Sequence, residues 1–127
     1  MPKPVTFTHA AVAATDNLRR LYSDETYRVS AHRVLENARN IHNGFPLFHA
    51  AGLALGCLTF LSGNVLVLGP PNHPCSPRMV KEILHTAHPE GAFIPSLIIE
   101  QISQEPAMVE EISNLKSIAF GSGMACS

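Results

Sequence analysis

FPLFHAAGLALGCLTFLSGNVLVLG, residues 45–69, is the stretch that decides the fold. Its first residues, 45–48, form a short apolar and aromatic run, which predicts a strand that ends at His49. Residues 50–61 are rich in Ala and Leu and predict a helix, which the following Ser-Gly pair ends. Residues 64–68 are an asparagine followed by a continuous run of valine and leucine, typical of a strand buried on both faces. The order strand, helix, strand predicts two parallel strands joined by a right-handed crossover.

More units of the same kind follow this stretch. Ser76 is a good N-cap and Pro77 suits the first helical position, so we expect a helix that runs to about His85. Short apolar runs then predict further buried strands, with helical patterns between them. The expected elements are strands at 91–94 and 116–120 and helices at 96–103 and 107–114.

The residues before this stretch are less regular. Apolar residues at helical spacing predict a helix from His9 to about Tyr22. The polar residues 23–33 are expected to form a connection, and the sparse apolar residues of 34–42 leave that segment open between helix and strand. Residues 1–127 are therefore expected to form an α/β fold, a mostly parallel sheet with flanking helices.

Composition excludes several classes of protein. Of the 127 residues, 46% are hydrophobic and 15% are charged, which excludes a disordered chain. The formal net charge is -1 and no basic stripe is present, so nucleic acid is not expected as a partner. The longest apolar stretch, 45–61, is interrupted by His49, Thr59 and two glycines, so no membrane span is expected. Three cysteines without CxxC spacing, and no apolar signal segment at the start, favour a cytoplasmic protein.

Parallel sheets bind ligands at the carboxyl ends of their strands. The residues to examine are therefore those that follow the expected strands: His49, Gly69, Pro95 and the turn at 121–123. The other histidines, including His85 and His88, lack a partner cysteine or carboxylate at zinc spacing, so no metal site is expected. No Ser-His-Asp arrangement or nucleophile elbow is visible either.

Four segments carry a resemblance to a known family. They are PKPV at 2–5, PLFHAAG at 46–52, IPS at 94–96 and LKSIAFGSG at 115–123. In this order they resemble the large N-terminal domain of the adenylate-forming (AMP-binding) superfamily, which includes acyl-CoA ligases, nonribosomal peptide synthetase adenylation domains and luciferases. The resemblance covers nearly the whole chain. It is closest to fungal-type synthetase-like reductases and domains that activate aryl or acyl acids, because Pro4 replaces a usual glycine and the last turn reads GSG.

The resemblance implies an ATP-dependent reaction in two steps. A small carboxylic acid attacks the α-phosphate of ATP in the presence of Mg²⁺, which gives an acyl-adenylate and pyrophosphate. A thiol then accepts the acyl group. This thiol would be coenzyme A or the phosphopantetheine of a carrier protein, and carrier-protein or reductase domains are candidates for further parts of the parent enzyme.

Several parts that the family needs are missing from the sequence. They are most of the Ser/Thr-rich phosphate loop, a later Tyr-x-Thr-Glu-like segment, the ribose-binding Asp, the hinge and the lysine of the C-terminal domain. We therefore expect residues 1–127 to be a fragment of a larger enzyme, with no catalytic residue and no adenylation activity of its own. The alternative is a non-catalytic or degenerate α/β interaction module.

The resemblance also implies which residues bind the acid. They are Phe48, His49, Ala50, Leu53, Ile118 and Phe120. Their small or apolar character indicates an apolar acyl group, aromatic or fatty. His49 stands where peptide synthetases carry the Asp that binds an ammonium group, which argues against an α-amino acid substrate. The alternatives are a His49 ring held by backbone at the sheet edge, and a place in the core for Ile118 and Phe120.

A second set of residues is implied for the nucleotide: Lys3, Gly121, Ser122 and Gly123. Lys3 would be the phosphate-loop lysine, and the glycine turn would lie against adenine, where absent side chains let the base approach. The alternatives are an exposed lysine near a terminus and an ordinary turn between a strand and a helix.

Overall fold

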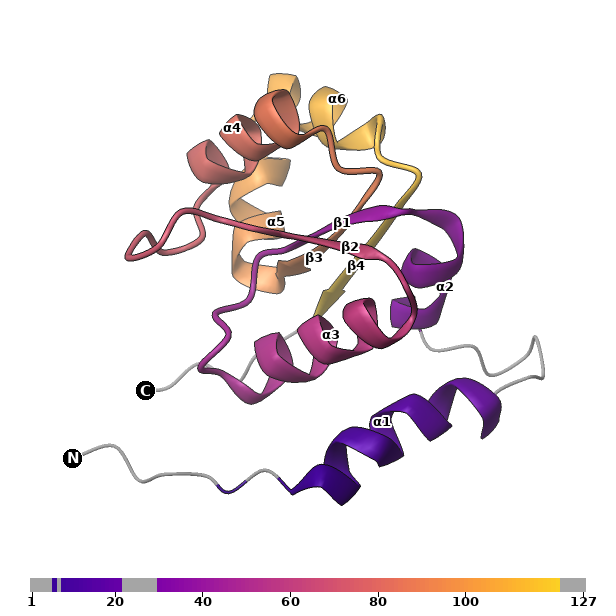
Figure 1. Ribbon diagram of the computed structural model, residues 1–127. Helices are drawn as coiled ribbons and strands as arrows, with labels where there is room; N and C mark the ends of the chain where they lie inside the picture. Colours follow the sequence, from indigo (N-terminus) through magenta and orange to yellow (C-terminus); the bar gives the residue numbers. More distant parts are fainter. Residues whose placement is uncertain (1–5, 7, 22–29, 122–127) are drawn as a thin grey trace.

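A parallel sheet of four strands lies at the centre of the described chain, with the strand order β2-β1-β3-β4 (Figure 1). The computed structural model describes residues 6, 8–21 and 30–121. The strands are β1 at Asn40–Asn43, β2 at Val65–Leu68, β3 at Gly91–Pro95 and β4 at Ser117–Gly121. The α/β fold with a parallel sheet is therefore confirmed.

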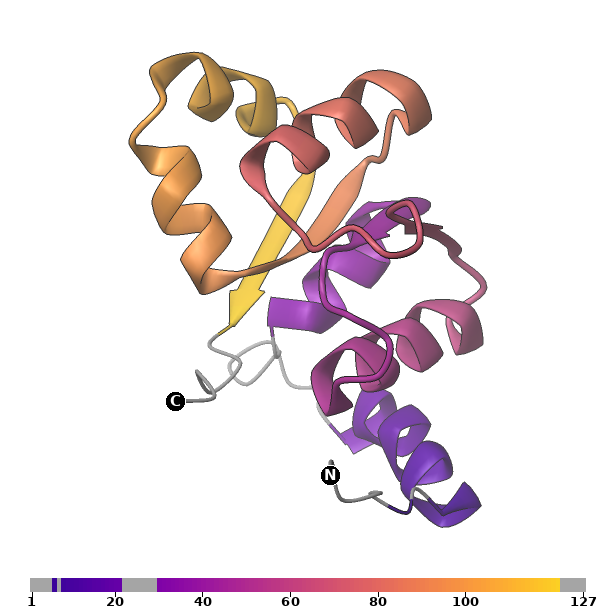
Figure 2. The same cartoon turned by 90° about the vertical axis from the view of Figure 1, so that its left-hand side faces the viewer.

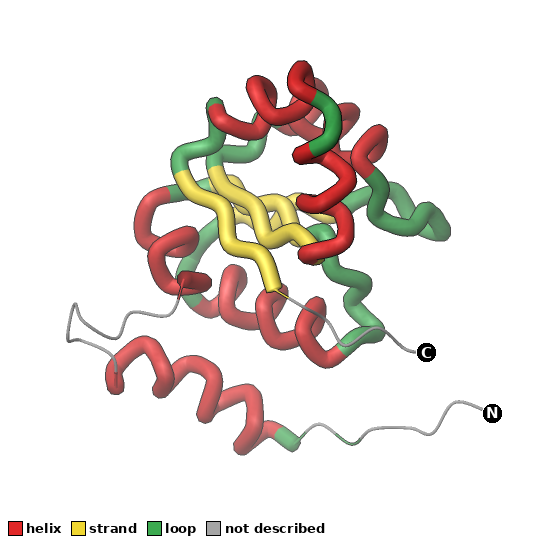
Figure 3. The backbone as a smooth tube through the Cα atoms, turned by 180° about the vertical axis from the view of Figure 1, so that it is seen from behind, coloured by secondary structure: helices red, strands yellow, loops and turns green. Residues whose placement is uncertain are grey.

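Helices cover both faces of this sheet (Figures 2 and 3). They are α1 at His9–Leu21, α2 at Ser30–Asn37, α3 at Ala50–Leu61, α4 at Pro77–Ala87, α5 at Ser96–Ser103 and α6 at Pro106–Ser113. One face carries α2 and α3, and the other carries α4, α5 and α6. Helix α1 lies alongside α3, on the side of α3 away from the sheet. None of the described helices is long and apolar enough to cross a membrane.

The core is divided by the sheet into two apolar clusters. Val34, Ile41 and Phe93 belong to the cluster under α2 and α3. Ile94 and Ile102 belong to the cluster under α4, α5 and α6. Neighbouring residues of β3 enter different clusters because successive side chains of a strand point to opposite faces.

The helices of the second half were predicted closely. Ser76 caps α4 as expected, because its side-chain oxygen accepts a hydrogen bond from the Met79 backbone nitrogen at 3.2 Å. Pro77 occupies the first turn, where its missing N–H costs nothing. The helices expected at 50–61 and 96–103 have the expected bounds.

The first strand was predicted in the wrong place. Residues 45–48 form a turn in which the His49 backbone nitrogen donates to the Pro46 carbonyl oxygen at 2.9 Å. Pro46 also has no N–H to give to a sheet. The real β1, residues 40–43, begins in the segment 34–42 that the sequence left open and ends one residue beyond it. Its NIHN sequence has a single aliphatic side chain, which gives no clear period. The expected connection at 23–33 is likewise wrong for its last residues, which form the start of α2.

Two strands are less buried than predicted. Strand β2 was expected to be buried on both faces, yet Val65 is 51% exposed and Leu68 is 46% exposed. On β4, Phe120 is 63% exposed. Both strands form edges of the sheet within the described residues, so one side of each lacks a neighbouring strand.

Candidate functional site

A pocket of about 710 Å³ opens at the carboxyl ends of β1 and β2. Its walls come from three places: residues 43–48, at the end of β1 and in the loop to α3; residues 68–75, in the loop between β2 and α4; and Met79 of α4. We call this site the loop pocket. Its volume is in the range of small-molecule sites, and its place agrees with the rule that parallel sheets bind ligands at carboxyl ends.

The first wall is fixed by the buried Asn43. Its side-chain amide donates to the Gly52 carbonyl oxygen at 2.9 Å, and its side-chain oxygen accepts from the Phe45 backbone nitrogen at 3.1 Å. At Gly52 a Cβ atom would lie 2.6 Å from the Pro46 carbonyl carbon and would overlap the oxygen bonded to it. Only glycine therefore allows α3 to start so close to this loop.

The second wall is a proline-rich loop between β2 and α4. Prolines occupy positions 70, 71 and 74, and each fixes the backbone angle φ at its position. Asn72 has a φ of 63°, a left-handed conformation that Asn tolerates well. The ring nitrogen Nδ1 of His73 lies 3.0 Å from the Pro71 carbonyl oxygen, so this nitrogen carries the proton and donates.

Glycines let the walls pack closely. A Cβ atom at Gly69 would lie 3.0 Å from the Met79 sulfur, and one at Gly44 would lie 3.0 Å from the Cys75 sulfur. At Gly56 of α3, a Cβ atom would lie 3.3 Å from a methyl carbon of Leu47. The side chains that line the pocket therefore lie directly against backbone.

The described residues that line the loop pocket include no lysine, arginine, aspartate or glutamate. Burial raises the pKa of the Cys75 thiol to about 11, so this thiol stays neutral. His73 is exposed in the same lining. The site is thus apolar, with imidazole and amide groups as its polar side chains.

His42 of β1 precedes the first wall and is buried, with 1% of its surface exposed. Its Nδ1 donates to the Val67 carbonyl oxygen at 3.2 Å, and its Nε2 has no partner among the described residues. Burial lowers the pKa of His42, with the hydrogen bond to Val67 as a smaller, opposing cause. The ring is therefore neutral, and it does not line the loop pocket.

The residues predicted to bind the acid are divided in the structure. Phe48 lines the loop pocket and is 94% exposed. His49 does not end a strand: it caps α3, and its Nδ1 accepts a hydrogen bond from the Ala51 backbone nitrogen at 3.2 Å. Ala50 and Leu53 lie in the first turns of α3, exposed and outside the pocket lining.

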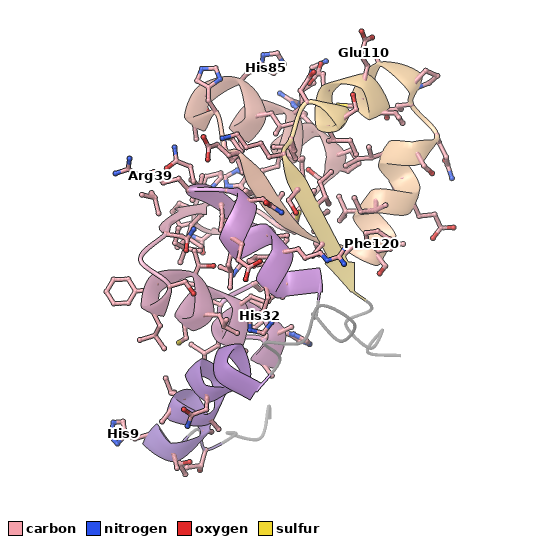
Figure 4. The ribbon with its side chains drawn as sticks, turned by 90° about the vertical axis from the view of Figure 1, so that its right-hand side faces the viewer. His9, His32, Arg39, His85, Glu110 and Phe120 are labelled. Carbon is pink, nitrogen blue, oxygen red and sulfur yellow. The ribbon has the colours of Figure 1, made fainter. Side chains whose placement is uncertain are left out.

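The β4 residues lie elsewhere. Ile118 and Phe120 are on the strand farthest from β2, in register with Ala92 and Ile94 of β3. Figure 4 labels Phe120 on this strand. Neither lines the loop pocket. Gly121 ends β4 and is exposed, with open space where a side chain would be. Lys3, Ser122 and Gly123, predicted to bind the nucleotide, lie outside the described residues.

Sequence reasoning missed most of the loop pocket. It singled out Gly69 as a residue to examine, but it did not find Leu47, Leu68, His73 or Met79. The signal available was the Gly-Pro-Pro that follows β2 directly. What the pattern could not give is that this loop folds back over the loop after β1.

A smaller pocket of about 240 Å³ lies beside α4 and α6, with His85, His88 and Glu111 in its lining. Glu111 binds the Lys81 ammonium at 2.9 Å and the His85 ring at 3.1 Å. The hydrogen bond from Lys81 lowers the pKa of Glu111. Within the described residues, no group of three His, Cys, Asp or Glu side chains is arranged to hold a metal ion.

Curated proteins that are similar to this chain include two fungal reductases. A carboxylic acid reductase of Neurospora crassa is 26% identical over 124 residues, which are 96% of this chain and 12% of that protein. The adenylate-forming reductase Nps10 of Heterobasidion annosum is 26% identical over 125 residues, 96% of this chain and 11% of that protein. No family model matches the chain, and no solved structure matches it. Over nearly its whole length, the chain is therefore similar to a small part of adenylate-forming reductases, which supports the adenylate-forming family at a coarse level.

Proposed function

We propose that this chain is a segment of an ATP-dependent enzyme that activates a carboxylic acid, and that the segment helps to bind the acid. The observation that carries the proposal is the placement of PLFHAAG, residues 46–52. This segment forms the loop after β1 and the start of α3, at the carboxyl edge of a parallel sheet, and its Phe48 lines the loop pocket. The names of the two relatives support the same reaction class.

The proposed reaction forms a bond between a carboxylate oxygen and the α-phosphorus of ATP, with pyrophosphate as the leaving group. Two anions meet in this step, so it needs cations and amide donors around the phosphates. Among the described residues, the lining of the loop pocket offers neither lysine nor arginine, and it has no carboxylate for Mg²⁺. Its residues therefore do not fit ATP or Mg²⁺, and they fit the apolar part of an acid. Nucleotide contacts remain proposed for Lys3, Gly121, Ser122 and Gly123.

Within this proposal, Phe48 and His49 have different roles. Phe48 offers an exposed aromatic face that an acyl group would cover. His49 uses its Nδ1 to hold the first turn of α3, so it positions the loop that carries Phe48. Ala50, Leu53, Ile118 and Phe120 remain proposed as acid contacts. The acyl acceptor is proposed to be coenzyme A or a carrier-protein phosphopantetheine.

The chain spans only 11% to 12% of the length of the curated relatives it matches. The test therefore compares the chain with the longer product of its own gene. Transcript sequencing should show, in frame, a Ser/Thr/Gly-rich loop upstream and a Tyr-x-Thr-Glu-like motif downstream. The longer product should exchange pyrophosphate into ATP when an aryl or fatty acid is present, and the chain alone should not.

Two results would contradict the proposal. One is an in-frame sequence without either motif, and the other is a folded longer product with no acid-dependent exchange. Pyrophosphate release by the purified chain alone would contradict the expectation that it is inactive.

A second candidate function, a non-catalytic interaction module, is favoured by the exposed apolar residues of the edge strands. Val65 of β2 and Phe120 of β4 expose more than half of their surface. Edge strands with apolar side chains pair readily with another chain. Sedimentation of the purified chain tests this candidate. It predicts a stable complex between copies of the chain, and Val65→Lys or Phe120→Lys should abolish that complex.

A further inference from the structure

We infer that the loop pocket binds an uncharged aromatic or branched aliphatic group, and that any charged group of the ligand stays outside it. The inference names the ligand class of the site used above, and in that respect it rests on the proposed function. It concerns binding by the described residues themselves, so it is tested without ATP.

The first argument is the exposure of apolar side chains around a single cavity. Leu47, Phe48 and Leu68 all line the loop pocket and are all exposed, Phe48 almost completely. Single exposed apolar residues are common on protein surfaces, but several around one cavity of ligand size indicate a binding site. A ligand in the pocket would remove these three side chains from water at once.

The second argument is that the backbone around the cavity is closely fitted. Three glycines give room to side chains that line the pocket: Gly44 to Cys75, Gly69 to Met79 and Gly56 to Leu47. A Cβ atom added at any of the three would lie only 3.0 to 3.3 Å from the side chain it faces. Prolines at 70, 71 and 74 restrict the loop that forms the other wall. A site with restricted walls loses little conformational entropy when a ligand enters.

The third argument is the absence of charge in the described lining. Both polar atoms of the Asn43 amide are already hydrogen-bonded, and the Cys75 thiol is neutral. A carboxylate or phosphate inside the pocket would lose its hydration and gain no cation in return. The polar end of a ligand is better placed beside His73, the exposed imidazole of the lining.

The test uses the purified chain with ¹³C-labelled methionine methyl groups. Met79 lines the pocket, and Met108 is buried in the cluster under α4, α5 and α6, so Met108 serves as an internal control. The probes are 3-phenylpropanamide, which is neutral, and 3-phenylpropanoate, which has the same hydrocarbon part and a charge. Both should shift the Met79 methyl signal, with Kd values within about threefold of each other, and leave Met108 unchanged.

Either of two outcomes overturns the inference. No shift of Met79 with either probe would mean that the pocket takes no apolar group. Binding of the acid more than about tenfold tighter than the amide would mean that the site recognises charge.

A matched pair of variants checks the location. Phe48→Ala removes an exposed ring from the pocket rim. It should raise the Kd of the amide about fivefold, because the ligand then covers less apolar surface. Phe60→Ala removes another exposed ring, from α3 outside the lining, and should leave Kd unchanged. Both side chains are exposed, so neither variant should unfold the chain. Equal effects of the two variants would contradict binding in the loop pocket.

The results separate the inference from the proposed function. If the amide shifts Met79 but the longer gene product activates no acid, the pocket stands and the proposed function falls. If the longer product activates acids while Met79 never responds, only the inference falls.

Discussion

The side-chain amide of Asn43 donates a hydrogen bond to the carbonyl oxygen of Gly52 over 2.9 Å, and this bond joins the end of β1 to the first turn of α3. The oxygen of the same amide accepts a hydrogen bond from the Phe45 backbone. One buried residue thus sets the path of the loop that carries Phe48.

Asn43→Ala should lower the free energy of unfolding by about 1–3 kcal/mol, because a buried carbonyl and a buried N–H lose their partners. Urea denaturation followed by circular dichroism measures the change. Asn37→Ala, at the exposed end of α2, is the matched control and should change stability by less than about 0.5 kcal/mol. Equal effects of the two substitutions would show that the Asn43 bonds contribute nothing.

Two glycines of α3 should differ in how much stability the same substitution costs. Gly52→Ala places a Cβ atom 2.6 Å from the Pro46 carbonyl carbon, so backbone must move. We expect a loss of about 2 kcal/mol or more. Gly56→Ala has its closest contact with the flexible end of Leu47, at 3.3 Å. The better helix propensity of alanine, about 1 kcal/mol, should offset that contact. Thermal denaturation of both variants decides the matter, and a similar Tm for the two would contradict the close contact at Gly52.

His42 should make the fold less stable in mild acid. Its pKa is lowered by burial in the folded chain, so the unfolded chain binds a proton more readily near the ordinary pKa of 6.5. Above that pH the His42 ring is neutral in both the folded and the unfolded chain, so it adds nothing to the pH dependence of stability. As the pH falls through 6.5 and below, stability should decrease by up to about 1.4 kcal/mol per pH unit from this group.

Urea denaturation at a series of pH values from about pH 7.5 to about pH 5 measures this slope. His42→Leu removes the titrating ring and should flatten it, whatever its effect on stability at neutral pH. An unchanged slope in the variant would assign the pH dependence to other groups.

Glu90 should titrate below its ordinary range. The Lys116 ammonium donates to it at 2.8 Å and is the largest cause of its lowered pKa, followed by the Arg39 backbone N–H at 2.6 Å. Lys116→Met should therefore raise the pKa of Glu90 while Arg39 still lowers it. Carboxyl chemical shifts against pH measure the pKa of Glu90 in the unmodified chain and in the variant. A pKa that does not move would show that Lys116 does not bind Glu90 in solution.

The sequence predicted helices well where caps and periodicity agree, as at Ser76 and Pro77. It failed at β1, because His42 and Asn43 are polar residues that are buried and hydrogen-bonded. A search for hydrophobic patterns does not detect such residues. Strand β2 shows the opposite failure. Its apolar run is typical of a fully buried strand, but its place at a sheet edge depends on strand order, which no local pattern contains.

The candidate site was predictable only in part. Phe48 was found through the PLFHAAG motif, and Gly69 through the rule that ligands bind after strands. The sequence did not show that His49 caps α3, because an imidazole that caps a helix looks the same in sequence as one that faces a ligand. Met79 lies within an amphipathic helix, where a pocket residue and a core residue follow the same pattern.

The contact between Gly52 and Pro46 gives a way to interpret natural variation. Gly52 is constrained by backbone alone, whereas Phe48, in the loop just before it, is exposed and free to change without strain. Homologous sequences that keep the glycine but differ at Phe48 should share the loop and differ in ligand. Those that lose the glycine should have rebuilt the loop itself. A single small residue thus separates divergence of specificity from divergence of architecture.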